Sequence, residues 1–446
     1  MTTITRPLPT SSGLERDARR ASADHSDAIA PGEVAIGVVI GRTAEFFDFF
    51  VYGIASVLVF PALFFPGADP LTAMTYSFAV FSLAFVSRPI GSVFFLAVDR
   101  RHGRGVKLTI ALFLLGGSTA GIAFLPPTVE IGWLAVLLLS LFRITQGFAL
   151  GGAWDGLAAL LAMNAPENRR GWYAMMPQLG APLGFLLAAA LFAYFLAVLS
   201  GDDFMQWGWR YPFYVAFAIN VVALFARLRL VATNEFERAM ESRDLEAEPV
   251  GEVLRHQGYN VVIGAFVPLA SFALFHLVTI FALSWATLFS GRSGEDFLLV
   301  QLIGGGVCAV AIAVSGLLAD RIGRRTLLSI GAVLIAGLSF ATPYLLRNGP
   351  GTETIFIVVG FALLGISLGQ AAGAVASNFS AAYRYTGSAL TSDISWLIGA
   401  GFAPLVALVL ASHFGLIMVG AYLLSGAVCT LVALWVNRKA KEIWSA

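Results

Sequence analysis

Charged residues are scarce in this chain. They make up only 12% of its 446 residues, whereas hydrophobic residues make up 58%. An average soluble domain carries about 25% charged residues. A soluble protein of this composition would not have enough polar groups to cover its surface. The sequence therefore predicts a membrane protein whose principal solvent is the lipid bilayer.

Several other features are missing. The two cysteines, Cys308 and Cys429, lie in apolar runs, which excludes a disulfide framework and a cysteine metal cluster. We predict no metal and no cofactor. The net charge of +1 gives no bulk attraction to nucleic acid, and we predict no such partner. No G-x-x-x-x-G-K-[ST] loop is present to bind ATP.

The chemistry of an enzyme is also missing. The five histidines and two cysteines are scattered, so they supply no clustered nucleophile, base or metal ligands. A membrane sensor would usually carry a sizeable soluble domain, and no such segment stands in the sequence. We therefore predict that the protein is neither an enzyme nor a sensor.

Long apolar segments fill most of the chain. The polar tail 1–32 contains no apolar core of a signal peptide, so the first apolar segment is expected to remain as a span. A transmembrane helix needs about 20 apolar residues. The expected spans are 34–60, 71–98, 106–126, 131–162, 172–199, 210–230, 259–289, 295–319, 326–346, 353–378, 388–411 and 414–437.

Lysine and arginine are unevenly distributed between the loops. With the N-terminus inside, the inner segments hold 22 of the 28 Lys and Arg residues and the outer loops hold three. Positive residues favour the cytoplasmic side of a membrane. We therefore expect a multi-pass protein of a bacterial inner membrane with both termini, 1–32 and 438–446, in the cytoplasm.

The sequence repeats itself across a charged central loop. Segment 231–258 separates six spans from six. Asp99–Arg104 follows the second span of the first half, and Asp320–Arg325 follows the second span of the second half. Such a repeat implies two structurally related bundles. We predict an all-α fold of twelve transmembrane helices in two pseudo-symmetric six-helix bundles, 33–230 and 259–437.

Several motifs resemble those of a known family. Residues Gly316–Arg325 read G-x-x-x-D-R-x-G-R-R, which resembles the signature loop of the major facilitator superfamily. The first-half copy has Phe95 in place of the usual glycine and one extra residue before Gly103. Shorter motifs are similar to those of the metabolite:proton symporters in that superfamily: Gly41–Gly53, Arg88–Gly91, Arg143–Gly147, Gly151–Gly152 and Arg384–Gly387.

Two departures from the family pattern leave the substrate open. Ala153 stands where the family usually has glutamate, and Asp155, two places on, is turned by about 200° around a helix. Segment Ser377–Ala381 lacks the family's acidic residue and F-P-T. The resemblance still implies alternating access, a monomer, and signature loops that act as a gate. The gate residues would be Asp99, Arg100, Arg104, Asp320, Arg321 and Arg324.

Ionisable residues in the first span are candidates for proton coupling. Arg42, Glu45 and Asp48 are spaced three apart, so we predict that they share one helix face. Charged groups inside a membrane are costly and persist where they are paired or line a hydrated cavity. Glu45 or Asp48 would be the coupling acid, with Asp155 as a further candidate. The alternative for Arg42 and Glu45 is a closed structural ion pair.

Arg143, in the fourth span, is the main candidate for binding substrate. Its planar guanidinium matches a carboxylate, so it would hold an anionic group of the substrate. The alternative is a permanent salt bridge to Glu45 or Asp48. His276 would either bind substrate or pack within the protein. The other candidate substrate-binding residues are Arg42, Trp154, Gln178, Gln370, Asp393 and Trp396.

The activity that these residues favour is secondary active transport. The first hypothesis is proton-coupled symport of a small organic acid or zwitterion. The second is a proton antiporter that exports an amphiphile, because Gly180–Gly184 faintly resembles a motif of drug:proton antiporters. The sequence does not distinguish import from export. The expected partners are the small solute, protons and the lipid bilayer.

Overall fold

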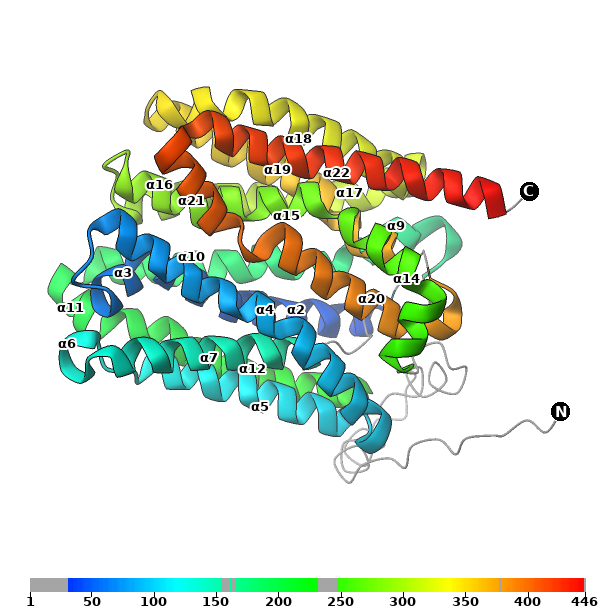
Figure 1. Ribbon diagram of the computed structural model, residues 1–446, viewed down its shortest axis with the longest axis horizontal. Coiled ribbons are helices and arrows are strands. Elements are labelled where there is room, and N and C mark those ends of the chain that lie inside the picture. Colours follow the sequence, from blue (N-terminus) through cyan, green and yellow to red (C-terminus); the bar gives the residue numbers. More distant parts are fainter. Residues whose placement is uncertain (1–30, 154–160, 162–164, 232–246, 377–378, 445–446) are drawn as a thin grey trace.

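The structure is a computed structural model that describes residues 31–153, 161, 165–231, 247–376 and 379–444. These residues form helices and no strands. Figure 1 shows that the helices run roughly alongside one another, with α5, α7 and α12 on one side and α18 and α22 on the opposite side. Helices α10, α15 and α20 lie between them. The predicted all-α architecture is confirmed.

Within the described residues, the first bundle contains six long helical segments. In its fifth segment, a turn of 3-10 helix, η2, joins two α-helices. The segments are α2 (Pro31–Leu58), α4 (Pro70–His102), α5 (Arg104–Ala123), α7 (Trp133–Gly152), α9 with η2 and α10 (Arg170–Met175, Met176–Leu179, Gly180–Val198) and α12 (Tyr211–Val231). Short helices connect them: α3 (Phe60–Phe64), α6 (Thr128–Ile131), η1 (Glu167–Arg169), α11 (Gly201–Gln206) and η3 (Gly208–Arg210).

The second bundle repeats this arrangement. Two of its six long segments contain a π-helical turn, η4 or η5, a feature that is frequent at functional sites. The segments are α14 and α15 with η4 and α16 (Val250–Phe266, Leu269–His276, Leu277–Phe281, Ala282–Leu288), α17 (Gly294–Ile322), α18 (Arg324–Arg347), α19 (Pro350–Ala376), α20 with η5 and α21 (Ala381–Trp396, Leu397–Gly401, Ala403–Phe414) and α22 (Leu416–Trp444).

The membrane-spanning character of these helices agrees with the predicted spans. Ten helical segments within the described residues are long and apolar enough to cross a membrane. Helix α2 is also long enough, but it carries Arg42, Glu45 and Asp48, and the 21-residue α12 completes the twelve. Helix α7 ends at Gly152, and residues 154–160 and 162–164 of the predicted fourth span and the segment after it lie outside the described residues.

The two signature loops adopt matching turns. Gly103 separates α4 from α5 with a φ of 84°, and Gly323 separates α17 from α18 with a φ of 83°. Glycine adopts this left-handed region without the steric cost that a side chain would add. The same turn at equivalent places in both bundles accounts for the repeated sequence pattern.

Small residues allow the helices of the first bundle to approach closely. A Cβ atom on Gly147 of α7 would lie 2.0 Å from the carbonyl oxygen of Ala84 in α4. One on Gly91 of α4 would lie 2.0 Å from the carbonyl oxygen of Phe148. Small residues are the usual means of tight helix packing in membranes. This packing fixes α7, and Arg143 with it, against α4.

Candidate functional site

A pocket lies between the two bundles. It has a volume of about 780 Å³, including its opening to solvent. Among its lining residues are Arg42, Glu45, Gln178, Ser392 and Trp396. A second compartment of about 470 Å³ shares Arg42, Glu45 and Trp396 with it and also reaches Arg143. The structure thus brings together five of the predicted site residues, Arg42, Glu45, Arg143, Gln178 and Trp396, around one connected space.

Arg42 and Glu45 form the ion pair that the sequence offered as an alternative. The Nη1 atom of Arg42 lies 2.6 Å from the Oε2 atom of Glu45. The guanidinium also lies 5.4 Å from the centre of the Phe46 ring. Since both charged residues line both compartments, the pair contributes charge to the pocket wall without being sealed inside the bundle.

Asp48 faces a different direction from Arg42. Six residues turn a helix by about 600°, which leaves Asp48 about 120° away from Arg42. The predicted single polar stripe is therefore split, and Asp48 points into the first bundle. It is 3% exposed. Its Oδ1 atom accepts hydrogen bonds from the Thr119 hydroxyl at 2.5 Å and from the Asn220 amide at 3.3 Å. These donors are neutral, unlike the partner of Glu45.

Arg143 is almost completely buried in the first bundle, with 1% of its surface exposed. Its Nε atom donates to the carbonyl oxygen of Phe81 at 3.1 Å, and its Nη1 atom donates to Oε1 of Gln146 at 3.1 Å. The guanidinium lies 3.9 Å from the ring centre of Tyr52. The Nη2 atom has no hydrogen-bond partner among the described residues. Arg143 is also one of the residues that line the second compartment.

A hydrogen-bonded chain joins Arg143 to Asp48. Arg143 donates to Gln146, the Nε2 atom of Gln146 donates to the Thr119 hydroxyl at 2.8 Å, and that hydroxyl donates to Asp48. Within the described part of the chain, Arg143 makes no ion pair with Glu45 or Asp48. The predicted alternative of a direct salt bridge is thus replaced by a relay of two neutral side chains. Thr119 and Asn220 were not predicted as site residues, although each is a polar residue within an apolar span.

His276 lies beside this network in an aromatic environment. It is fully buried, and its ring centre lies 5.2 Å from that of Phe275 and 5.7 Å from those of Phe49 and Phe81. Neither ring nitrogen has a hydrogen-bond partner among the described residues. The ring is therefore packed among aromatic side chains without hydrogen bonds to the described residues, and His276 is not among the residues that line either compartment.

Asp393 joins the two bundles. Its carboxylate, on α20, lies 2.7 Å from the Nε atom of Arg88 on α4 and also accepts a hydrogen bond from Ser92. The Arg88 guanidinium lies 5.8 Å from the ring centre of Trp396. The structure thus places Asp393, a predicted substrate ligand, in an ion pair between bundles at the edge of the pocket.

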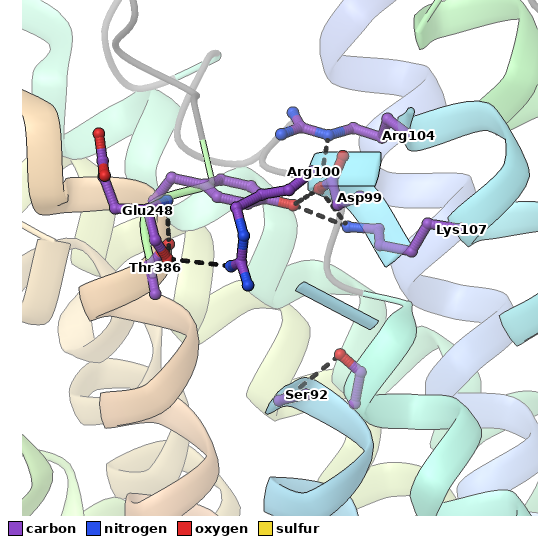
Figure 2. A network of polar contacts seen from close by, with 9 residues as sticks. Ser92, Asp99, Arg100, Arg104, Lys107, Glu248 and Thr386 are labelled. Carbon is purple, nitrogen blue, oxygen red and sulfur yellow. Dashed lines mark hydrogen bonds and ion pairs between the residues drawn. The ribbon is translucent and has the colours of Figure 1, made fainter. Parts of the chain in front are cut away.

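The first signature loop contacts the second bundle (Figure 2). Asp99 is buried and accepts hydrogen bonds from Lys107 at 3.1 Å, from Arg104 at 3.3 Å and from the Tyr385 hydroxyl at 3.1 Å. Tyr385 belongs to α20 of the second bundle. Lys107 also donates to the Tyr385 hydroxyl at 2.7 Å. Arg100 reaches the central loop and donates to the Glu248 carbonyl oxygen at 3.3 Å.

The second signature loop makes the corresponding contact with the first bundle. The Asp320 carboxylate accepts hydrogen bonds from the backbone N–H groups of Gly171, at 2.6 Å, and Trp172, at 3.2 Å. These groups lie in the first turn of α9, where they have no partner within the helix. Arg324 donates to the Gly373 carbonyl oxygen at 2.7 Å and to Gln370 at 3.4 Å.

Gln370 belongs to this second contact. Its Nε2 atom donates to the carbonyl oxygen of Gly171 at 3.2 Å. The structure therefore places this predicted substrate ligand at the loop and not among the lining residues of the pocket. Arg321 is exposed and makes no ion pair with any described residue. Two further predicted site residues, Trp154 and Asp155, lie outside the described residues.

Comparison with known proteins identifies the chain. The sequence profile of the Major Facilitator Superfamily matches residues 135–392. The inner membrane metabolite transport protein YhjE of Escherichia coli K12 is 36% identical over 432 residues, which cover 94% of this chain and 98% of that protein. The chain belongs to the major facilitator superfamily. It is a membrane transporter and not an enzyme, as the sequence predicted.

Other relatives of this transporter have more specific names. The shikimate transporter of Escherichia coli K12 is 32% identical over 403 residues, covering 88% of this chain and 91% of that one. A crystal structure of a D-xylose–proton symporter superposes with a TM-score of 0.70 at 19% identity, covering 91% of this chain and 96% of that chain. The structural match confirms the two-bundle fold.

The second signature loop offers a test of the gate. We expect Asp320→Ala to raise the hydrogen-exchange rate of the Gly171 and Trp172 amides about tenfold or more, because charge-assisted hydrogen bonds contribute roughly 1.5–3 kcal/mol. Hydrogen–deuterium exchange of the reconstituted transporter, read by mass spectrometry on peptides that cover α9, measures this. Arg321→Ala is the control and should leave the rate unchanged. Equal exchange in the Asp320 variant and the parent would contradict a latch at this position.

Proposed function

We propose that this transporter is a proton-coupled symporter that imports a small organic acid or a zwitterion with a carboxylate. The observation that carries the proposal is the relay from Arg143 to Asp48. The Nη2 atom of Arg143 has no partner among the described residues, and Arg143 lines the second compartment together with residues of both bundles. Asp48 lies at the other end of the relay, where it is hydrogen-bonded to neutral donors. An anion site and a proton site are thus joined through two side chains.

Asp48 suits proton coupling better than Glu45. Glu45 is held by Arg42 at 2.6 Å, so adding a proton to it would break an ion pair and leave a cation unbalanced. Asp48 can take up a proton without that loss. Its hydrogen-bonded link to Arg143 lets the proton and the substrate anion influence each other.

Charge balance supports a fixed ratio of one proton to one monovalent anion. Three arginines, Arg42, Arg88 and Arg143, line the second compartment. Three carboxylates, Glu45, Asp48 and Asp393, lie beside them, so the group is neutral when all six are ionised. A single anion would add one uncompensated charge within the membrane, which is costly. Uptake of one proton restores neutrality and makes joint binding favourable.

The sequence feature that suggested export has a structural explanation. A Cβ atom on Gly180 would lie 2.5 Å from the Cβ atom of Arg42, and one on Gly184 would lie 2.6 Å from the backbone nitrogen of Phe47. Both glycines therefore allow α10 to pack closely on α2. Export remains an outcome of the test below. We further propose an inner-membrane location, both termini in the cytoplasm, and a monomer.

Proton movement into liposomes tests the proposed function. The purified transporter is reconstituted with a trapped pH dye, and monocarboxylates, dicarboxylates, betaines and amphiphiles are added outside under pH gradients of both signs. We expect lumen acidification that depends on a carboxylate and, for a monovalent anion, does not change with an imposed membrane potential. Empty liposomes correct for passive entry of weak acids. Solute-driven alkalinisation of the lumen would instead establish antiport.

A further inference from the structure

One membrane-spanning segment of the second bundle is buried on nearly all sides. In the apolar stretch of Leu269–Leu288, which comprises α15, η4 and α16, 94% of the residues are buried, against at most 61% in the other nine candidate spans within the described residues. The ring centre of Phe275 lies 5.3 Å from that of Phe50 on α2. A Cβ atom on Gly53 of α2 would lie 2.6 Å from the Cδ1 atom of Ile280. The segment therefore lies between its own bundle and α2 of the first bundle.

These contacts lie on the side of the pocket away from the signature loops. Helix α14 begins beside the first signature loop, and α15 and α16 follow it toward the opposite end of the molecule (Figure 1). Phe272 and Trp396 line the pocket and stack with their ring centres 4.3 Å apart. Phe275 and His276 come next along the segment, and their ring centres lie 6.1 and 5.7 Å from that of Phe49 on α2. An aromatic wall thus closes the pocket on this side.

The backbone of η4, just beyond this wall, departs from α-helical hydrogen bonding. The N–H group of Ala282 donates to the carbonyl oxygen of Leu277, five residues before it, and to that of Thr279. In an α-helix its acceptor would be Val278. Gln301 of α17 takes the vacated place, because its Nε2 atom donates to the carbonyl oxygens of Val278 and Thr279 at 2.7 Å each. Gln301 is fully buried, so these hydrogen bonds are shielded from water.

These hydrogen bonds favour the π-helical turn over a regular α-helix. In an α-helix both carbonyl oxygens would accept from backbone N–H groups four residues further on, and they would need no side-chain donor. The Oε1 atom of Gln301 has no hydrogen-bond partner among the described residues, and an unpaired buried acceptor is unfavourable. An apolar side chain would avoid that cost, so packing does not explain an amide here. The amide stabilises one backbone form of the segment and not the other.

From this geometry we infer that Gln301 is a positioning residue, which holds the transporter closed at the end away from the signature loops by stabilising the π-helical turn. Conversion of η4 to α-helix shifts the register by one residue and rotates one side of the turn by about 100° relative to the other. Phe275 before the turn and Ile280 near its end both contact α2. A rotation of this size separates one of them from α2, so the bundles are released at this end.

Distances between spin labels, measured by double electron–electron resonance, test the inference. Val129→Cys on α6 and Phe414→Cys on α21 place one label on each bundle at the end away from the signature loops. His102→Cys and Ile322→Cys place a second pair at the loop end. All four positions are exposed. The full-length transporter is studied in lipid nanodiscs without substrate, and both native cysteines are replaced by alanine.

Variants of Gln301 identify the group responsible. Gln301→Met has a similar size but no donor, and we expect it to raise the long-distance population of the first label pair about tenfold. It should not lengthen the distance between the labels at the loop end. Gln301→Asn is shorter and reaches at most one carbonyl oxygen, so its shift should be smaller and in the same direction. The asparagine variant carries the test if the methionine variant does not fold.

Ser284→Ala is the matched control. Ser284 is also buried in this segment, but its hydroxyl donates to the Phe281 carbonyl oxygen of its own helix at 2.7 Å. The control should give the distances of the parent at both ends. Thermal unfolding of each variant verifies that it retains the parent fold.

Two results would overturn the inference. Parent-like distances in the folded Gln301 variants would show that the amide does not distinguish the two states. Equal broadening of the distances at both ends would show a general loss of packing and not a role in closure. The measurement uses neither a substrate nor a pH gradient, so its result is independent of the proposed symport.

Discussion

Replacing Asp48 by asparagine is expected to abolish proton-driven accumulation while leaving substrate exchange intact. Asparagine has nearly the same shape as a protonated aspartic acid and can still accept the hydrogen bond from Thr119. The variant should therefore bind substrate without exchanging a proton. A gradient of one pH unit stores about 1.4 kcal/mol, enough for about tenfold accumulation by one-to-one symport. The Asp48→Asn transporter should reach a ratio of about one.

Radiolabelled counterflow separates this effect from loss of folding. Liposomes loaded with unlabelled substrate should still take up labelled substrate through the Asp48→Asn variant at a rate within a few-fold of the parent. Glu45→Gln is the comparison. If Glu45→Gln removes accumulation and retains counterflow while Asp48→Asn behaves like the parent, the coupling acid is Glu45 and our assignment of Asp48 is wrong.

Replacing Arg143 is expected to have the largest effect on substrate affinity. Removing one partner of a buried, hydrogen-bonded charge pair costs about 2–5 kcal/mol, which corresponds to roughly a thirtyfold or greater loss of binding. Arg143→Ala should show this loss. Arg143→Lys should recover only part of the affinity, because lysine retains the charge but not the planar fork that donates to Phe81, Gln146 and the substrate together.

The matched control for this prediction is Arg88→Lys. Arg88 also lines the second compartment, but its guanidinium already forms an ion pair with Asp393, in which the Nε atom lies 2.7 Å from the Oδ1 atom. A lysine can retain that ion pair, so substrate affinity measured by calorimetry should change by only a few-fold. Equal losses in the two lysine variants would show that overall positive charge, and not the guanidinium of Arg143, binds the anion.

Prediction of the site from sequence worked for residues whose position depends on one helix. Arg42 and Glu45 are three residues apart on α2, and helix geometry alone brings them together. It worked less well for Asp48, since a further three residues turn its side chain away from Arg42 and into the bundle. Thr119 and Asn220 could not be assigned because their common partner, Asp48, lies far from both in the sequence.

The sequence by itself determined the membrane class, the helical repeat and the superfamily, because apolar length, loop charge and the signature motifs are local properties of the chain. Only the tertiary structure decided which residues Asp393 and Gln370 contact. Asp393 meets Arg88, and Gln370 meets the backbone of Gly171, each across the boundary between bundles. Contacts of this kind depend on how two bundles are placed against each other, which the periodicity of a single helix does not encode.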